Sequence, residues 1–111
     1  MTINSKQKGA RFERKLASMF REYGFDCRRS QQYCGANGDA DVIGLPGIHC
    51  ECKHVERLNI HDAMNQAKGD AKSGTFPVVF HKKNNHEILA TMQFDTFMTL
   101  YKEWWENNEV E

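Results

Sequence analysis

Two acidic residues and a lysine near the middle of the chain have the spacing of a metal-dependent hydrolytic site. Asp41 precedes an apolar pair, and Glu51 follows ten residues later in the sequence Glu51-Cys52-Lys53. Side chains alternate along a β-strand, so Glu51 and Lys53 are expected on one face and Cys52 on the other. Carboxylate oxygens are ligands that Mg²⁺ and Mn²⁺ prefer, and a nearby ammonium can offset charge on a reacting phosphate. The segment therefore predicts a carboxylate metal site that contains a lysine.

The two acidic segments are predicted to pair as a hairpin around the three-residue loop Leu45-Pro46-Gly47. Such a loop favours a left-handed residue at its end, which suits Gly47. The resulting register sets Asp41 directly opposite Glu51, with their Cβ atoms about 5 Å apart. Like charges at such a pair repel each other unless a cation lies between them. A loop one residue longer or shorter would place the two acids on opposite faces. Lys53 would then form only a surface ion pair with Glu51.

Hydrophobic periodicity and turn residues predict the elements that position this hairpin. The expected helices span 5–23, 60–73 and 95–106, and the expected strands span 25–31, 41–45, 48–53, 76–81 and 87–92. The order α-β-β-β-α-β-β-α predicts an α/β fold, with a mixed central β-sheet flanked by helices, in one domain over 1–111. The stripe expected to be buried in the first helix comprises Phe12, Leu16, Met19, Phe20 and Tyr23. Adjacent Trp104 and Trp105 in the last helix are expected to leave some aromatic surface exposed, either as a dimer contact or packed on the protein's own sheet.

The segment Ala40-Asp41-Val42-Ile43, followed by Glu51-Cys52-Lys53, resembles the signature of PD-(D/E)xK nucleases, with Ala40 where that signature often has proline. The order of elements over residues 6–92 is similar to the restriction-endonuclease-like core of that superfamily. Within it, the chain most resembles the small Holliday junction resolvases of the archaeal type and their phage relatives. Residues 6–14 look like their first helix, and Gln66-Ala67 resembles a Gln-Ala pair in their second.

The resemblance implies roles for individual residues. The catalytic residues would be Glu13, Asp41, Glu51, Lys53 and Gln66, and Glu13, Asp41, Glu51 and the carbonyl group of Cys52 would bind Mg²⁺, for which Mn²⁺ could substitute. The metal in such enzymes polarises a phosphate oxygen and activates water, so no protein nucleophile is needed. Glu13 could instead be an ordinary helix-surface residue, and Gln66 a solvated one. Ser30 and Asp39 are the further candidates for an assisting role.

The net charge is zero, but the charges are unevenly distributed along the sequence. Residues 1–33 carry eight Lys and Arg against three acidic residues, and residues 34–111 carry seven against twelve, including an acidic tail at about 103–111. A basic front half suits a polyanion, although a solvated helix face with an acidic tail is the alternative. The resemblance implies that a homodimer binds branched DNA such as a four-way junction. The expected DNA contacts are Lys6, Lys8, Arg11, Arg14, Arg28, Arg29, Lys68 and Lys72.

The four cysteines, Cys27, Cys34, Cys50 and Cys52, are expected to be buried free thiols. A zinc knuckle favours Cys-x-x-Cys, whereas this chain offers only Cys-x-Cys. The sequence lacks an apolar run of about 18 residues and a secretory signal, so we expect a cytoplasmic protein of a bacterial, archaeal or phage-infected cell, without membrane association.

Three other functions are consistent with parts of the pattern. The nearest is a flap, nicking or virus-type replication-repair nuclease of the same fold. A non-catalytic DNA-binding protein on a nuclease scaffold belongs to a different class, although the intact Glu51 and Lys53 argue against it. The third is a histidine-type metal nuclease that would use His81, Asn85, His86 and Glu87, although the asparagines there are typical of a turn.

Overall fold

The computed structural model describes residues 5–30 and 40–108, which form the helices and strands in the predicted order. The helices are α1 (Ser5–Glu22), α2 (Ile60–Asp70) and α3 (Phe94–Asn108). The strands are β1 (Arg28–Arg29), β2 (Val42–Ile43), β3 (Ile48–His54), β4 (Phe76–Lys82) and β5 (Leu89–Met92). The prediction of a mixed α/β fold is therefore confirmed.

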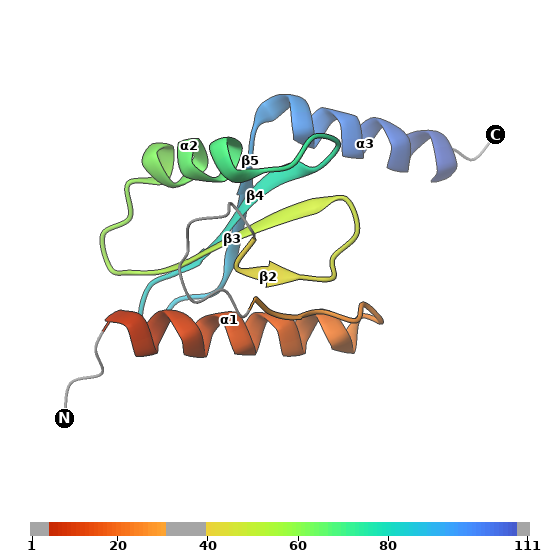
Figure 1. Ribbon diagram of the computed structural model, residues 1–111. Coiled ribbons are helices and arrows are strands. Elements are labelled where there is room, and N and C mark those ends of the chain that lie inside the picture. The colour runs from red at the N-terminus through yellow and green to blue at the C-terminus, as the bar shows by residue number, and fades with distance from the viewer. Residues whose placement is uncertain (1–4, 31–39, 109–111) are drawn as a thin grey trace.

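The five strands lie in the order β1-β2-β3-β4-β5 and form one mixed sheet. Only β3 and β4 run parallel, and α2 forms the crossover that a parallel connection requires. The other neighbours are antiparallel. Helices α1 and α2 lie on opposite sides of the sheet (Figure 1). The central strand β3, which carries Glu51 and Lys53, therefore has one face toward α1 and the other toward α2.

Strand alternation divides the buried residues between these two faces. Phe12 and Leu16 of α1 pack in one cluster with Cys50 and Cys52 of β3. Ala63 and Ala67 of α2 pack against Val79 of β4 on the other face. The prediction that both β3 cysteines face the core is confirmed. Because neighbouring side chains alternate, Glu51 and Lys53 lie on the α2 face.

Several element ends differ from those that the sequence predicts. Strands β1 and β2 contain only two residues each. Helix α2 ends at Asp70, because Ala71 is extended and Gly69 weakens the last turn. Its predicted N-cap is confirmed, since Asn59 Oδ1 accepts a hydrogen bond from the Asp62 N–H. The prediction that Tyr23 is buried was wrong: Tyr23 is 81% exposed because the chain leaves the helix after Glu22.

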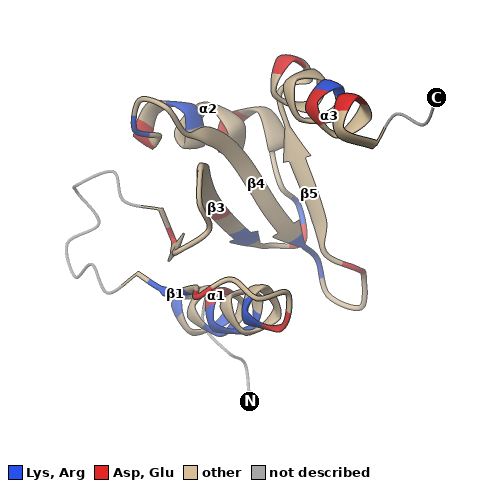
Figure 2. Cartoon of the chain, turned by 90° about the vertical axis from the view of Figure 1, so that its right-hand side faces the viewer, with Lys and Arg blue, Asp and Glu red and all other residues tan. Residues whose placement is uncertain are grey.

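Helix α3 extends beyond the sheet and packs extensively against no other described element (Figures 1 and 2). Thr96 is its one buried residue. Its aromatic side chains remain 45–75% exposed: Phe94, Phe97, Tyr101, Trp104 and Trp105. The alternative in which this helix packs on the protein's own sheet is therefore wrong. In the described part of the chain, no helix has the length and apolar character to cross a membrane.

Candidate active site

The loop that precedes Glu51 has the predicted geometry. The Ile48 N–H donates to the Leu45 carbonyl across 3.2 Å, and Gly47 has a φ of 76°. Val42 pairs with Cys50, which is the register that the three-residue loop requires. Gly44 also has a positive φ, and a Cβ there would collide with the main-chain oxygen of Asp26. The local sequence thus fixes how β2 aligns with the strand that carries Glu51.

The regular ladder ends at Asp41, one residue before β2. The Asp41 N–H donates to the Cys50 carbonyl across 2.9 Å, so its backbone does not form the expected regular pair with Glu51. The Asp41 carboxylate instead reaches along β3 and accepts a 2.8 Å hydrogen bond from the Cys52 N–H. This bond holds the carboxylate beside the backbone that joins Glu51 to Lys53.

Glu51 and Lys53 lie on one face of β3, as predicted. The Glu51 side chain is buried, and its Oε2 lies 3.8 Å from Lys53 Nζ. Lys53 Nζ also donates a 3.0 Å hydrogen bond to Gln66 Oε1 on α2. The structure therefore brings Glu51, Lys53 and Gln66 together, although Gln66 is 13 residues away from Lys53 in the sequence.

Glu13 approaches the same region from α1. Its side chain is 17% exposed, and Oε1 accepts a 2.7 Å charge-assisted hydrogen bond from Arg29 Nε of β1. Glu13 is therefore held by an arginine and differs from an ordinary helix-surface glutamate. Arg29, which the sequence predicts to contact DNA, here binds a carboxylate of the protein.

The electrostatic environment of Asp41 links these groups. Burial is the largest cause that raises its pKa, from 3.8 to about 6, and the negative charges of Glu51 and Glu13 raise it further. The Cys52 N–H and the Lys53 ammonium oppose this shift by favouring the charged carboxylate. The three acids thus lie close enough to repel one another, and their cationic neighbours compensate that repulsion only in part. A divalent cation would reduce the remaining repulsion.

Asp41 and Glu51 are donors of the type that a hard cation with few protein ligands would use. Among residues 5–30 and 40–108, no group of three His, Cys, Asp or Glu side chains is arranged to hold a metal ion. Mg²⁺ commonly uses one or two carboxylates and completes its octahedron with water and substrate phosphate. Asp41 and Glu51 would supply these carboxylates. The carbonyl of Cys52 is the predicted main-chain ligand between them.

His49 is a neighbour of the site that the sequence reasoning missed. It is 4% exposed, and its Nε2 lies 3.4 Å from Glu51 Oε1. The signal was available, because His49 precedes Glu51 by two residues and must share its face of the strand. A cavity of about 150 Å³ adjoins His49 and is also lined by Lys72 and Thr75. This cavity brings one predicted DNA-contacting lysine to the edge of the site.

His81 lies beside Lys53, because these residues pair directly in the parallel ladder of β3 and β4. A 2.8 Å hydrogen bond joins its Nε2 to Thr91 Oγ1, and burial lowers its pKa. The residues of the histidine-type alternative form no metal-holding group in the described structure. Asn85 has a φ of 64°, which confirms its role in the turn. The same absence applies to the carboxylate site in the described residues, so only the turn geometry of Asn85 favours the turn interpretation over the histidine-type alternative.

The predicted DNA contacts fall into two groups. Helix α1 carries Lys6, Lys8, Arg11 and Arg14, next to Arg28 and Arg29 of β1, whereas Lys68 and Lys72 belong to the α2 side. These groups lie on opposite sides of the sheet (Figure 2). Lys8 forms an ion pair with Glu56 across 3.7 Å. A DNA contact to both groups would therefore have to span the edge of the sheet.

The cysteines that the structure describes are free. Cys27, Cys50 and Cys52 are buried, as predicted, and burial raises all three pKa values, that of Cys50 to about 12. Their thiols are therefore protonated at neutral pH. Cys34 and Asp39 lie outside the described residues. The Ser30 N–H donates to the Asp41 carbonyl across 2.9 Å, so Ser30 adjoins the site through its backbone.

Comparison of this chain with family models, curated proteins and solved structures found no match.

Proposed function

We propose that this protein is a Mg²⁺-dependent endodeoxyribonuclease of the PD-(D/E)xK type, with a restriction-endonuclease-like core. The observation that carries the proposal is the arrangement along β3. The Cys52 N–H holds the Asp41 carboxylate beside the strand that presents Glu51 and Lys53 on one face. Two acids and a lysine at this spacing suit hydrolysis of a phosphodiester bond.

Each residue has a role that follows from its surroundings. Asp41 and Glu51 would hold the metal, which when bound polarises a phosphate oxygen and promotes ionisation of water. Lys53 would orient the attacking water and offset charge on the phosphate, because its ammonium lies at the same face. Gln66 keeps that ammonium in place through its 3.0 Å hydrogen bond. Glu13, held by Arg29, would support the metal ligands from α1.

The proposed substrate is branched DNA, most specifically a four-way junction. Basic residues lie on both sides of the sheet, and contacts of Lys and Arg to phosphate provide affinity without sequence readout. A ligand that engages both sides must offer phosphates in more than one direction, which the arms of a branched DNA do. A flap or nicking nuclease is the alternative within the same fold.

The proposed assembly is a homodimer formed through α3. Phe94, Phe97, Tyr101 and Trp104, with neighbouring Trp105, recur at helical spacing on the exposed helix. Phe97 stacks on Tyr101 at 5.9 Å between ring centroids, and Tyr101 contacts Trp104 at the same separation. An exposed stripe of this kind marks an interface more often than a solvated surface.

The exposed aromatic area would supply a large part of an interface with a second copy of this chain. A fully buried aromatic side chain covers about 150–250 Å², so five that are about half exposed offer roughly 500 Å². A standard interface buries about 800 Å² per partner, and Met98, 40% exposed, extends the stripe. Pairing of two such helices would also give the two-fold symmetry needed for paired cuts in opposite strands of a junction.

A cleavage panel tests the proposed function. Purified protein is incubated with four-way junction, flap, single-stranded and linear duplex DNA, in Mg²⁺ and in EDTA. We expect Mg²⁺-dependent paired nicks in the junction and little cleavage of linear duplex. Tight junction binding without cleavage in Mg²⁺ or Mn²⁺ would instead support the non-catalytic DNA-binding protein.

A further inference from the structure

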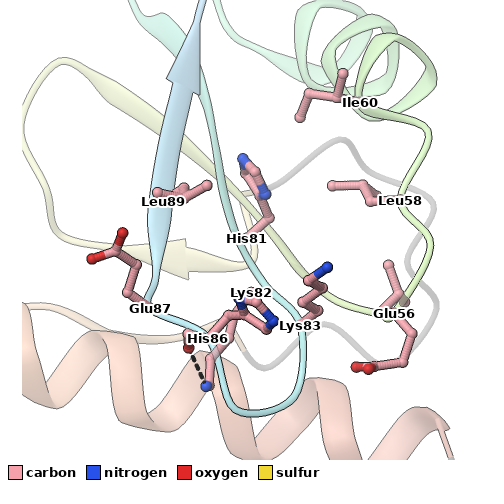
Figure 3. A pocket seen from close by; sticks show the side chains of 10 residues that line it. Glu56, Leu58, Ile60, His81, Lys82, Lys83, His86, Glu87 and Leu89 are labelled. Carbon is pink, nitrogen blue, oxygen red and sulfur yellow. Dashed lines mark hydrogen bonds between the residues drawn. The ribbon is translucent and has the colours of Figure 1, made fainter.

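A pocket of about 300 Å³ lies on the α2 face, close to the proposed active site. Part of its lining is apolar: Figure 3 shows the His81 ring between Leu89 on one side and Leu58 and Ile60 on the other. Polar and charged side chains line the rim, namely Glu56, Lys82, Lys83, His86 and Glu87. A cavity with apolar walls and a polar rim is typical of a site that accepts a flat, partly polar ring.

The pocket is placed next to the site by the strand register. His81 pairs directly with Lys53, and Leu89 of β5 pairs with His81. Neighbouring strands lie about 5 Å apart, so one strand spacing separates the backbone of Lys53 from that of His81. A nucleotide adjoining a phosphate held at Lys53 can therefore reach the pocket without leaving the protein surface.

The charges at the rim suit a nucleic acid backbone. Lys83 lies at the rim, and Lys82 Nζ donates a 2.6 Å hydrogen bond to the His86 carbonyl. Glu56 is already engaged, because the Asn84 N–H donates to it across 2.7 Å and Lys8 lies 3.7 Å away. Glu87 is the other acid of the rim. The rim thus carries two lysines and two acids, and Lys83 is the cation that we assign to the phosphate of an inserted nucleotide.

The geometry points to a binding site for one unpaired nucleobase that adjoins the cut phosphodiester. The base lies against the imidazole ring of His81 where that ring lines the pocket, and it contacts the apolar side chains of Leu89 and Leu58, while its backbone passes Lys83. A base paired in a duplex cannot enter, because its faces and its pairing edge are occupied. This inference rests on the proposed nuclease function and narrows its substrate to DNA with an unstacked nucleotide at the cleavage point.

The test combines a pocket substitution with removal of one base. Once the cut is mapped, an abasic nucleotide replaces either neighbour of the cleaved phosphate, and a control junction carries the abasic nucleotide far from the cut. Leu89→Trp fills the pocket from a half-exposed position on β5. Phe25→Trp, at a similarly exposed apolar residue outside both the pocket and α3, is the matched control.

We expect the abasic nucleotide beside the cut to slow the wild-type protein by about tenfold or more, since base stacking on aromatic rings has that weight. Leu89→Trp should slow cleavage of the intact junction comparably, and base removal should then cause little additional loss. The Phe25→Trp variant should respond to base removal as the wild type does. If base removal slows the Leu89→Trp variant by the same factor as it slows the wild type, the base-binding site is wrong. Cleavage of the abasic junction at the normal rate by the wild type would also overturn it.

A binding measurement separates this inference from the nuclease function. In EDTA, 2-aminopurine replaces the unpaired base, and its fluorescence should change when wild-type protein binds but not when Leu89→Trp binds. The same signal in both proteins would contradict the pocket assignment. Absence of Mg²⁺-dependent cleavage of the unmodified junction would overturn the nuclease function, whatever the fluorescence shows.

Discussion

The Cys52 main-chain N–H donates a 2.8 Å hydrogen bond to the Asp41 carboxylate. The bond joins the end of β2 to the middle of β3 and orients an acid whose pKa is raised to about 6 by burial, Glu51 and Glu13. The hydrogen bond from Cys52 lowers the pKa of Asp41 and so cancels only part of that rise. The metal-free protein therefore holds Asp41 in an environment that disfavours its charge, which is the condition under which cation binding is favoured.

This environment makes stability depend on pH in a defined direction. The folded pKa of about 6 exceeds the ordinary 3.8, so ionising Asp41 costs more in the folded state than in the unfolded state. The contribution of the protonated Asp41 carboxyl to the free energy of unfolding is complete below about pH 4, and it is lost as the pH rises through 6. Asp41→Asn should therefore be more stable than wild type above pH 6, by about 1–3 kcal/mol, in EDTA.

Urea unfolding at several pH values checks this prediction. The advantage of Asp41→Asn should disappear near pH 4, and Mg²⁺ should stabilise the wild type but not the variant. A difference that is constant between pH 4 and 8 would show that the Asp41 carboxyl does not experience the proposed charge environment. Cleavage by Asp41→Asn should be abolished.

Lys53 is predicted to act in the reaction and not in DNA binding. Lys53→Ala should abolish cleavage while junction affinity changes little, because the ammonium is aimed at Glu51 and Gln66. Gln66→Ala should slow cleavage less, since it removes a positioning contact only. Lys15→Ala, at an exposed lysine on α1, is the matched control for charge. Equal cleavage rates for Lys53→Ala and Lys15→Ala would refute the role of Lys53.

Arg28 and Arg29 are predicted to act differently although they are adjacent. Arg28 is exposed, so Arg28→Ala should flatten the log-log salt dependence of junction binding by about one unit. Arg29 is bound to Glu13, so Arg29→Ala should reduce turnover more than it changes the salt dependence. Glu13→Gln should slow cleavage by about tenfold or more. The comparison requires binding titrations at several salt concentrations and single-turnover rates.

Replacing both arginines by Ala should weaken binding to junctions of every sequence alike. Identical salt slopes for the two single variants would show that the Glu13–Arg29 pair does not withhold Arg29 from DNA.

The exposed face of α3 predicts a dimer that one charge can disrupt. Tyr101→Lys should shift the protein from dimer to monomer in analytical ultracentrifugation at micromolar concentration, because Tyr101 lies between Phe97 and Trp104. Glu106→Lys changes charge on the same helix at an exposed position and is the control. A wild-type protein that sediments as a monomer at that concentration would contradict the interface.

Local sequence could predict the hairpin but not everything that surrounds it. The loop ending at Gly47 fixed the Val42–Cys50 register, and alternation correctly separated Glu51 from Cys52. The end of the ladder at Asp41 was not predictable, because it depends on a side-chain bond to the Cys52 N–H. The pairing of Lys53 with His81 could not be predicted from local sequence either, because parallel strands join residues that are separated in the sequence by a helix.

Tertiary contacts also determine which aromatic side chains are covered and which charged side chains are paired. Periodicity predicted a helix over 95–106, which the structure extends to Phe94–Asn108, but it did not predict whether the aromatic stripe of that helix would be covered. The charge of Arg29 is visible in the sequence, whereas the Glu13 carboxylate that binds it is visible only in the structure.

The most direct test of the proposed nuclease compares Glu51→Gln with Glu103→Gln in Mg²⁺-dependent cleavage of a four-way junction. Glu51 is buried beside Lys53, and Glu103 is exposed on α3, so the same chemical change removes a proposed metal ligand or only a surface charge. Glu51→Gln should bind the junction but fail to cut it, whereas Glu103→Gln should cut like the wild type. Equal cleavage by both variants would contradict the assignment of the active site.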